Sequence, residues 1–400
     1  MTLIAEHLNL VKTSEVSVVT AKALELERQG KSVVRLSAGE PDFPTPDHIK
    51  MACIKALCDN KTKYPAVIGL PELREAICLK LKRDNALDYK PAETIVCTGA
   101  KQVLYNAMTA TLDPGDEAIM PAPYWMSYVG MVQLSRATPV IVPTRQENGF
   151  KMTAADLEKA ITPKCRWLFL NSPSNPAGAV YSPEELKALA EVLRRHSQVW
   201  VISDDIYEYI TYDEFKFTSL LNVAPDLKDR FLIVNGPSKT YSMTGWRVGY
   251  AAGPEELIKA MFKIQSQSTS GANHMAQWAT VAALTGDHLF IARNNAEYAA
   301  RRKLVVALSS EIPGLSSAPP QGAFFSLISC GAYLGKKAPD GTIVATDEQL
   351  VDYLLNGVGV ATIPGAPFGM PGYFRVSFAT SQQNIKTAFE RIGEALGRLD

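Results

Sequence analysis

The sequence lacks several features that mark particular classes of protein. Its 400 residues carry 41 Lys and Arg against 41 Asp and Glu, and no run of basic residues interrupts this balance. We therefore expect no binding to nucleic acid or to an acidic membrane surface, since both need a local excess of positive charge. No apolar run reaches the about 20 residues that a membrane-spanning helix needs. These absences favour chemistry on small molecules.

Cysteine and histidine are few and scattered. The six cysteines include no CxxC pair, and the five histidines show no spacing typical of metal ligands. We expect neither a metal site nor a disulfide framework. The first residues, MTLIAEHLNLVKTSEV, are not a basic leader followed by an apolar segment, so we expect a cytoplasmic location.

Short β-branched runs alternate with amphipathic helical patterns from about residue 94 onward. The runs are TIVCT, EAIMP, TPVIVP, CRWLFLN, QVWVISD, RFLIVNG and WRVGYAAG. Among the helical patterns between them, one is expected to begin at Tyr124, and SPEELKALAEVLRRH predicts a capped helix. Such alternation predicts an α/β fold with a mostly parallel sheet flanked by helices. Each run ends at polar or glycine residues, and ligands of open α/β sheets bind at the carboxyl ends of strands.

The pattern changes beyond about residue 286. A long charged helix, a few short strands and the amphipathic helix QQNIKTAFERIGEALGRL predict a smaller α+β domain over residues 286–400. Residues 1–45 contain a helix ended by Gly30 and the strand SVVRLS, and we expect them to pack with this smaller domain. Residues 46–285 then form the large, ligand-binding domain.

The segment GPSKTYSMTGWRVGY, residues 236–250, lies between two predicted strands. Lys239 would therefore face the crevice at the strand ends. A lysine amine can form a Schiff base with an aldehyde when burial or a nearby cation lowers its pKa, and Arg247 could be that cation. Judged by its residues alone, the segment fits a solvated lysine and a buried arginine equally well.

The same segment closely resembles the cofactor-lysine signature of class I aminotransferases, which are fold type I enzymes. In that family the lysine carries pyridoxal 5′-phosphate and the arginine binds the cofactor phosphate. The likeness covers nearly the whole chain and points to the bacterial aspartate aminotransferases that also use prephenate. It implies a seven-stranded sheet in the large domain. Further matching motifs are LSAGEPDF, KYPAVIGLPELREA, TGAKQ, PAPYW, NSPSNPAGAVY, SDDIYE and FRVSFAT.

The resemblance gives roles to residues around the cofactor ring, with Lys239 as the catalytic amine. Asp204 would pair with the pyridine nitrogen, and Tyr207 and Asn175 would hydrogen-bond the phenolic oxygen. Trp125 would stack on the ring. Without the resemblance, Asn175 suits an ordinary turn and Trp125 suits core packing.

A second group of residues would hold the cofactor phosphate together with Arg247. Gly99, Ala100 and Lys101 open a helix directly after the strand TIVCT, where free backbone amides and the helix dipole suit an anion. The resemblance also implies that Tyr64 reaches the phosphate of a partner subunit. We therefore expect a homodimer with shared active sites.

The resemblance also places the substrate. Arg375 would bind the α-carboxylate as a bidentate fork beside Gly39, with Trp125 and Asn175 contacting the substrate as well. A strand-end arginine outside such a family is more often a surface ion pair. Lys12 and Lys101 match positions that bind the distal carboxylate. The chain departs from the pattern there, because KTSEV stands where KPSAT is expected, which weakens the case for Lys12.

These matches imply a ping-pong transfer of the amino group of L-aspartate or glutamate to 2-oxoglutarate or oxaloacetate, with prephenate as a further acceptor. Three alternatives stay open at this point. The chain could be an aromatic or broad-specificity aminotransferase, or a pyridoxal phosphate-dependent C–S lyase. It could also be the effector-sensing domain of a transcription regulator, which would need a fused DNA-binding segment.

Overall fold

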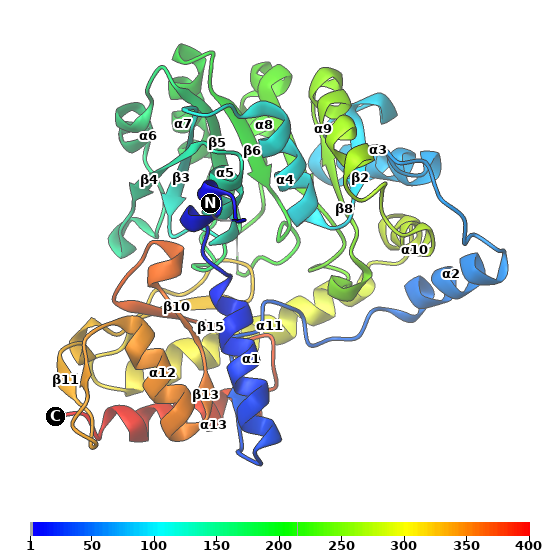
Figure 1. Ribbon diagram of the computed structural model, residues 1–400. Helices are drawn as coiled ribbons and strands as arrows, with labels where there is room; N and C mark the ends of the chain where they lie inside the picture. The colour runs from blue at the N-terminus through cyan, green and yellow to red at the C-terminus, as the bar shows by residue number, and fades with distance from the viewer. Residues whose placement is uncertain (1–2, 214) are drawn as a thin grey trace.

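A seven-stranded sheet forms the centre of the larger part of the molecule (Figure 1). The computed structural model describes residues 3–213 and 215–400. The strands are β2 (Thr94–Cys97), β3 (Glu117–Ala122), β4 (Thr138–Pro143), β5 (Cys165–Asn171), β6 (Trp200–Asp204), β7 (Phe231–Asn235) and β8 (Gly249–Ala252). Their order is β2-β8-β7-β6-β5-β3-β4, and only β8 runs antiparallel to its neighbours. The mostly parallel seven-stranded sheet predicted from the sequence is confirmed.

Helices cover both faces of this sheet, because alternate strand residues point to opposite sides. Ile202 and Leu232 pack with α4 (Ala100–Thr111), α5 (Ser127–Leu134) and α9 (Glu255–Gln267). Their neighbours Val201 and Ile233 pack on the other face. The helices of that second face are α3 (Pro71–Asn85), α6 (Ala154–Ala160), α7 (Pro183–Arg195), α8 (Leu220–Val223) and α10 (His274–Thr285), with α2 (Asp47–Cys58) beside α10.

Local signals set the ends of several helices. At the start of α7, the Ser182 side chain accepts a hydrogen bond from the Glu185 backbone nitrogen, and the Glu185 carboxylate accepts one from the Ser182 backbone nitrogen. This capping box is visible in the sequence as SPEE. The helix expected from Tyr124 begins only at Ser127, because residues 123–126 form the connection between β3 and α5. That expectation was wrong by three residues, and Trp125 consequently lies on a loop.

The smaller part of the molecule joins the two ends of the chain. β1 (Val34–Arg35) pairs in parallel with β13 (Val360–Ala361), and residues of α1 (Glu15–Arg28) share a core with the C-terminal helices. Those helices are α11 (Leu289–Glu311), α12 (Asp347–Val358) and α13 (Gln382–Leu396). The strands β9 (Ser316–Ser317), β10 (Phe325–Ser329), β15 (Tyr373–Ser377) and β14 (Ile363–Pro364) form an antiparallel sheet, and β11 (Lys336–Lys337) pairs with β12 (Ile343–Val344). The division at residues 45 and 285 stays a prediction.

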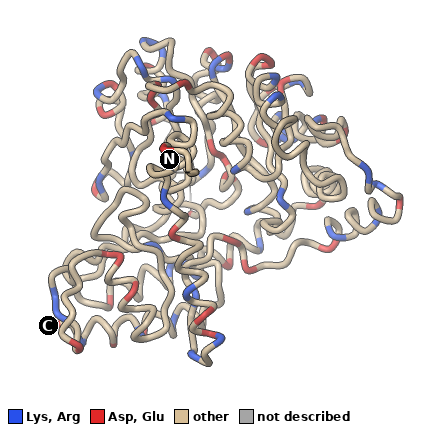
Figure 2. Tube along the Cα trace, in the orientation of Figure 1, with Lys and Arg blue, Asp and Glu red and all other residues tan. Residues whose placement is uncertain are grey.

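Short 3₁₀ helices complete the secondary structure. They are η1 (Glu6–Leu10), η2 (Pro91–Glu93), η3 (Gln146–Asn148), η4 (Pro225–Arg230), η5 (Thr244–Trp246), η6 (Gly331–Tyr333) and η7 (Ala366–Phe368). Charges of both signs are interspersed over the molecule (Figure 2). Among the described residues, no helix is long and apolar enough to cross a membrane, and no cluster of three His, Cys, Asp or Glu could hold a metal ion.

Candidate active site between the sheet and the smaller part

A cleft of about 380 Å³ lies where the carboxyl ends of the central strands meet the smaller part of the molecule. It contains side chains or backbone from both parts, which the chain brings together from positions more than three hundred residues apart. The sequence-predicted residues in its lining are Gly39, Ala100, Lys101, Trp125, Asn175, Asp204, Tyr207, Lys239, Arg247 and Arg375. The structure therefore gathers most of the predicted site at one place.

Lys239 follows β7 and lies half-buried in the cleft. Its Nζ donates to the carbonyl oxygen of Gly39 and lies 6.0 Å from the ring centroid of Tyr207. Burial lowers the pKa of Lys239 to about 8; the charge of Glu40 opposes this shift and that of Arg375 adds to it. An amine with this pKa is uncharged, and so nucleophilic, much more often than an exposed lysine.

Asp204 ends β6 and is only 4% exposed. The hydroxyl of Tyr128 donates to its Oδ2 at 2.6 Å, whereas Oδ1 has no hydrogen-bond partner among the described residues. Burial raises the pKa of the Asp204 carboxyl to about 6, against the opposing effects of the Tyr128 hydrogen bond and of Lys239. A buried carboxylate with a free oxygen is suited to a cationic or N–H group of a ligand.

Arg375 lies on β15 and is 1% exposed. Its Nη1 donates to Asn175 Oδ1 at 2.9 Å and its Nη2 to the Ser37 carbonyl at 2.8 Å, which leaves Nε without a partner among the described residues. The guanidinium carbon lies 4.4 Å from the ring centroid of Phe325. Burial lowers the pKa of Arg375 to about 10. The cation is held in one orientation, with donor capacity left for an anion.

Tyr207 is packed between the two parts of the molecule. Its ring meets Phe324 and Phe325 edge-on, at centroid distances of 5.5 and 5.9 Å. Burial raises the pKa of the Tyr207 hydroxyl, while the charge of Arg375 opposes the shift. The hydroxyl therefore stays protonated and can donate a hydrogen bond at neutral pH.

A backbone cradle lies at the start of α4. Gly99, the residue before the helix, has φ of 87°, and a Cβ atom there would come 2.6 Å from Arg247 Nη2. A Cβ on Gly249 would collide with the backbone nitrogen of Ala100. Arg247 itself has φ of 55°, a left-handed conformation that non-glycine residues rarely adopt. The cation and the free amides of a helix start are thus held together, an arrangement that binds anions.

Lys101 and Trp125 form one wall of the cleft. Lys101 Nζ lies 4.8 Å from the Trp125 ring centroid, and the Trp125 ring meets Tyr128 edge-on at 5.4 Å. Burial, followed by the charge of Arg247, lowers the pKa of Lys101. The indole is thereby fixed beside the carboxyl ends of the strands.

Three predicted residues are not in the lining of this cleft: Gly99, which precedes α4 and borders Arg247, and the more distant Lys12 and Tyr64. Lys12 is exposed and lines an adjoining cavity of about 750 Å³, which Lys101 and Arg247 share. Tyr64 is 94% exposed, on the connection between α2 and α3. A single chain therefore does not bring Tyr64 to the site.

Three residues at the site were missed by the sequence reasoning. Tyr128 binds Asp204, Asn171 Nδ2 donates to the Asp204 carbonyl at 2.7 Å, and Glu40 accepts from Thr244 Oγ1 at 2.9 Å. Glu40 lies within the motif SAGEPDF, and Asn171 ends β5, so their positions carried a signal. A buried tyrosine such as Tyr128 looks like any core aromatic.

Comparison with known proteins gives a consistent picture. The family model for aminotransferase class I and II matches residues 31–392. A probable aspartate/prephenate aminotransferase of Rhizobium leguminosarum bv. phaseoli is 51% identical over 397 residues, covering 99% of each chain. An aspartate/prephenate aminotransferase of Cereibacter sphaeroides is 50% identical over 392 residues, covering 98% of each.

Solved structures agree with these sequence matches. The aspartate aminotransferase of Rhizobium meliloti superposes with a TM-score of 0.96 at 47% identity over the whole of both chains. The Thermus thermophilus aspartate aminotransferase solved with maleate gives a TM-score of 0.92 at 42% identity, covering 99% of this chain and 100% of that one. Such likeness extends from the central sheet to the smaller part.

Proposed function

This chain belongs to the class I and II aminotransferases and is a pyridoxal phosphate-dependent enzyme, and on that premise we propose how its residues work and which substrates it takes. One observation carries the proposal. Lys239, a half-buried amine with a lowered pKa, shares a cleft with the Asp204 carboxylate and the Arg375 guanidinium. Each of these two groups keeps one polar atom that no described residue pairs.

The residues present fit pyridoxal phosphate. Asp204 Oδ1 is a buried acceptor with no partner in the described part of the chain, as a pyridinium N–H requires. The guanidinium of Arg247 lies where a side chain on Gly99 would otherwise be, beside the free amides at the start of α4. Arg247, Gly99, Ala100 and Lys101 would hold the phosphate.

Lys239 would hold the cofactor covalently through Nζ, with Trp125 beside the ring and Tyr207 and Asn175 at its phenolic oxygen. When bound, the cofactor supplies an aldehyde carbon that links to amines and a ring that accepts electrons from the substrate α-carbon. Asp204 would keep the ring nitrogen protonated, because a buried carboxylate favours a positive charge beside it.

Arg375 binds and orients the substrate, and Lys239 moves its α-proton. The unpaired donor of Arg375 binds the α-carboxylate, with Gly39 leaving room beside it, and this contact orients the α-hydrogen. Once the substrate amine has displaced it, Lys239 Nζ would take the α-proton as a general base and, as a general acid, deliver it to the carbon that the cofactor's aldehyde supplies. A pKa near 8 suits both directions, because neither form of the amine is rare near neutral pH.

The substrates we propose are L-aspartate or glutamate as donor and 2-oxoglutarate or oxaloacetate as acceptor, with prephenate as a further acceptor. Relatives carry the names aspartate/prephenate and aspartate aminotransferase, and one was solved with the dicarboxylate maleate. Lys101, which lines the cleft, supplies the cation for a distal carboxylate, and Lys12 in the adjoining cavity can add to it.

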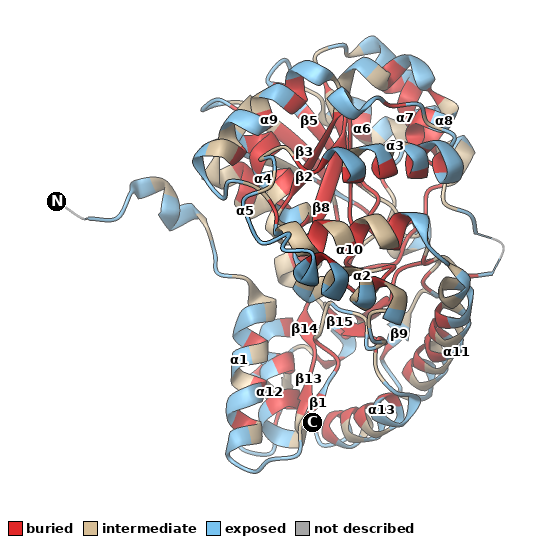
Figure 3. Cartoon of the chain, turned by 90° about the vertical axis from the view of Figure 1, so that its right-hand side faces the viewer, coloured by how far each residue is buried: buried red, intermediate tan, exposed pale blue. Residues whose placement is uncertain are grey.

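We propose further that the enzyme is a homodimer with shared sites. Residues 3–13 precede α1 as an extended arm, whose η1 contacts α5 (Figure 3). Leu3, Leu8 and Leu10 on this arm are 99, 42 and 60% exposed, which is unfavourable unless another surface covers them. Tyr64 of one subunit would complete the phosphate site of the other. The cytoplasmic location stays a prediction.

The decisive test replaces Lys239 with Ala in the purified enzyme. We expect turnover of aspartate with 2-oxoglutarate to disappear, while Lys263→Ala, at an exposed surface lysine, retains wild-type rates. Undiminished turnover in Lys239→Ala would overturn the proposed role of Lys239.

A panel of amino donors, with prephenate among the acceptors, tests the substrates. Reaction only with aromatic or aliphatic donors would contradict the dicarboxylate proposal, and release of pyruvate with ammonia would indicate elimination by a C–S lyase instead.

Hybrid dimers test the shared site. A Tyr64→Ala chain and a Lys239→Ala chain are coexpressed with different affinity tags, and the hybrid is purified. Each homodimer should be impaired, but the hybrid contains one site with both native residues and should regain up to half of the wild-type rate. A hybrid no more active than the mean of the two homodimers would refute a Tyr64 contribution across subunits.

A further inference from the structure

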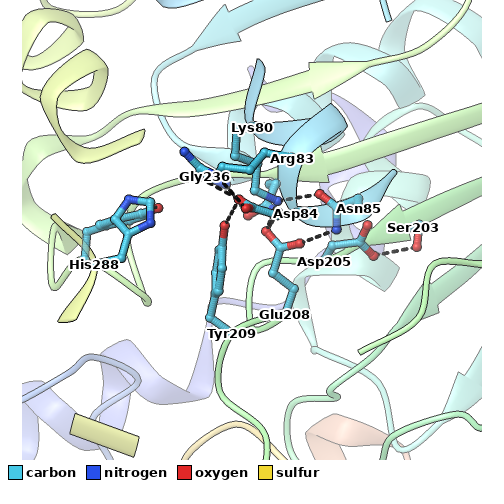
Figure 4. A network of polar contacts seen from close by, with 12 residues as sticks. Lys80, Arg83, Asp84, Asn85, Ser203, Asp205, Glu208, Tyr209, Gly236 and His288 are labelled. Atoms are coloured by element: carbon cyan, nitrogen blue, oxygen red, sulfur yellow. Dashed lines mark hydrogen bonds and ion pairs between the residues drawn. The ribbon is translucent and has the colours of Figure 1, made fainter. Parts of the chain in front are cut away.

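A cluster of buried polar residues lies outside the cleft lining (Figure 4). Its centre is Glu208, 7% exposed, one residue after Tyr207. Lys80 on α3, 1% exposed, donates from Nζ to Glu208 Oε1 and, at 2.7 Å, to Asn85 Oδ1. Asn85 Nδ2 donates to Glu208 Oε2 at 2.7 Å. We call Lys80, Asn85, Glu208 and Asn235 the Glu208 network.

Asn235 connects this network to the turn that carries Lys239. It is the last residue of β7 and 3% exposed, and its Nδ2 donates to Glu208 Oε1 at 2.6 Å. Its Oδ1 accepts from the Gly236 backbone nitrogen at 2.7 Å. Gly236 is tightly confined, since a Cβ there would lie 3.0 Å from the Val248 carbonyl. The side chain of Asn235 thus fixes the backbone three residues before Lys239.

Glu208 is itself tied to the segment that carries Asp204 and Tyr207. Its backbone nitrogen donates to the Asp205 carbonyl at 2.9 Å, and the Asp205 nitrogen donates to the Val234 carbonyl on β7 at 2.9 Å. Tyr207, directly before Glu208, faces the cleft. One carboxylate therefore contacts both chain segments that present the reacting groups.

The network is fully paired. None of its four members is among the described residues with a buried, unpartnered side-chain atom. A buried ion pair of this kind contributes little net stability compared with apolar packing, so its physical value lies in fixing geometry. Glu208 accepts from three donors on two different elements, which defines the position of the Asn235 side chain more narrowly than packing alone.

We propose that Glu208 is a positioning residue for the reaction. Held by Lys80 and Asn85, its carboxylate fixes the Asn235 side chain and so the turn that presents Lys239 to Asp204 and Tyr207. This inference rests on the proposed role of Lys239.

The test uses the cofactor-loaded enzyme and two variants, Glu208→Gln and Asn235→Ala. The second removes the hydrogen bonds of the Asn235 side chain with Glu208 and with Gly236, and leaves the pair of Lys80 with Glu208 in place. We measure the pH midpoint of the visible absorbance of the bound cofactor, together with kcat, KM and Tm. The absorbance reports the environment of the Lys239 linkage directly.

Both variants should shift the absorbance midpoint by at least about half a pH unit. We expect kcat to fall about tenfold, within the hundredfold that a misplacement of about 1 Å can cause, and the KM for aspartate to change less than about twofold. The double variant should show the same kcat as the more impaired single variant, since both act through one connection.

Arg230→Met is the matched control. Arg230 anchors the opposite end of β7 by donating to the carbonyls of Leu193, His196 and Val199. Its loss should lower Tm without moving the absorbance midpoint. If Glu208→Gln and Asn235→Ala lower Tm like Arg230→Met and leave the midpoint and kcat unchanged, the inference is wrong, while an inactive Lys239→Ala still supports the proposed function. If Lys239→Ala is active, the proposed function has failed as well.

Discussion

Two buried polar clusters lie on neighbouring turns of this molecule, and they differ in whether their hydrogen-bonding capacity is used. In the Glu208 network every side chain has its partners. In the cleft, Asp204 Oδ1 and Arg375 Nε have none among the described residues, and burial shifts the pKa values of Asp204, Lys239 and Arg375. Unpaired buried groups are costly. Of the ten such side-chain atoms among the described residues, only these two belong to residues that line the cleft, where a ligand can supply the missing partners.

This difference separates the residues that should stabilise the fold from those that should be needed for turnover. Removing one partner from the Glu208 network should destabilise the fold, because the remaining charge is then buried alone, even though the intact pair adds little net stability compared with apolar packing. Unpaired groups in the cleft should oppose folding of the cofactor-free chain and be needed for turnover. Substitutions in the two clusters should therefore have opposite effects on stability.

The largest effect on stability is expected in the network. Lys80→Met removes the cation and leaves the Glu208 carboxylate buried without its charge partner, so the free energy of unfolding should fall by about 3–5 kcal/mol. Urea unfolding of this variant and of Lys263→Met, an exposed control, measures the difference. A Lys80→Met protein as stable as wild type would remove the contrast between the clusters.

The cleft should behave in the opposite way. The pKa of Asp204 is raised from 3.8 to about 6, so the folded chain binds a proton that the unfolded chain has released between those pH values, and stability falls as pH rises through them. Asp204→Asn should stabilise the cofactor-free protein at pH 8 by up to about 3 kcal/mol, and the gain should vanish near pH 4. Turnover should fall. Urea unfolding midpoints measured between pH 4 and pH 8 test this prediction. Destabilisation by Asp204→Asn at pH 8 would contradict the account.

Arg375→Lys tests the role of the planar guanidinium of Arg375. Lysine keeps the charge but loses the planar pair of bonds to Asn175 and Ser37, so kcat/KM for aspartate should fall about 10- to 100-fold, as expected for hydrogen bonds to charged groups. Steady-state kinetics measures the loss. Arg391→Lys, which alters a bond to the Ser32 carbonyl in the smaller part, should not change it.

The smallest effects are expected at Lys12 and Lys101, the two lysines proposed to bind the distal carboxylate. Lys12 is exposed and lines only the adjoining cavity, so Lys12→Ala should raise the KM for aspartate less than about fivefold. Lys101→Ala should raise it more, because Lys101, although also exposed, lines the cleft itself. The ratio of KM for aspartate to KM for an apolar donor separates carboxylate binding from general damage. A larger effect at Lys12 would place the distal carboxylate in the outer cavity.

The sequence predicted the parts that carry local signals. The strand runs gave the sheet, the capping box SPEE gave the start of α7, and the motif around Lys239 gave the family. The contact of Tyr128 with Asp204 and the pairing of Lys80 with Glu208 could not be predicted. Lys80 and Glu208 are 128 residues apart, and neither position has a spacing or neighbour that distinguishes it from an ordinary surface charge.

The central claim is that Lys239 carries the cofactor. Borohydride reduction of the loaded enzyme, followed by proteolysis and mass spectrometry, fixes the cofactor to the lysine that holds it. The account predicts one modified peptide, the one containing Lys239, and none in the Lys239→Ala variant. A label on Lys101, the other lysine in the cleft lining, or on any lysine elsewhere would contradict it.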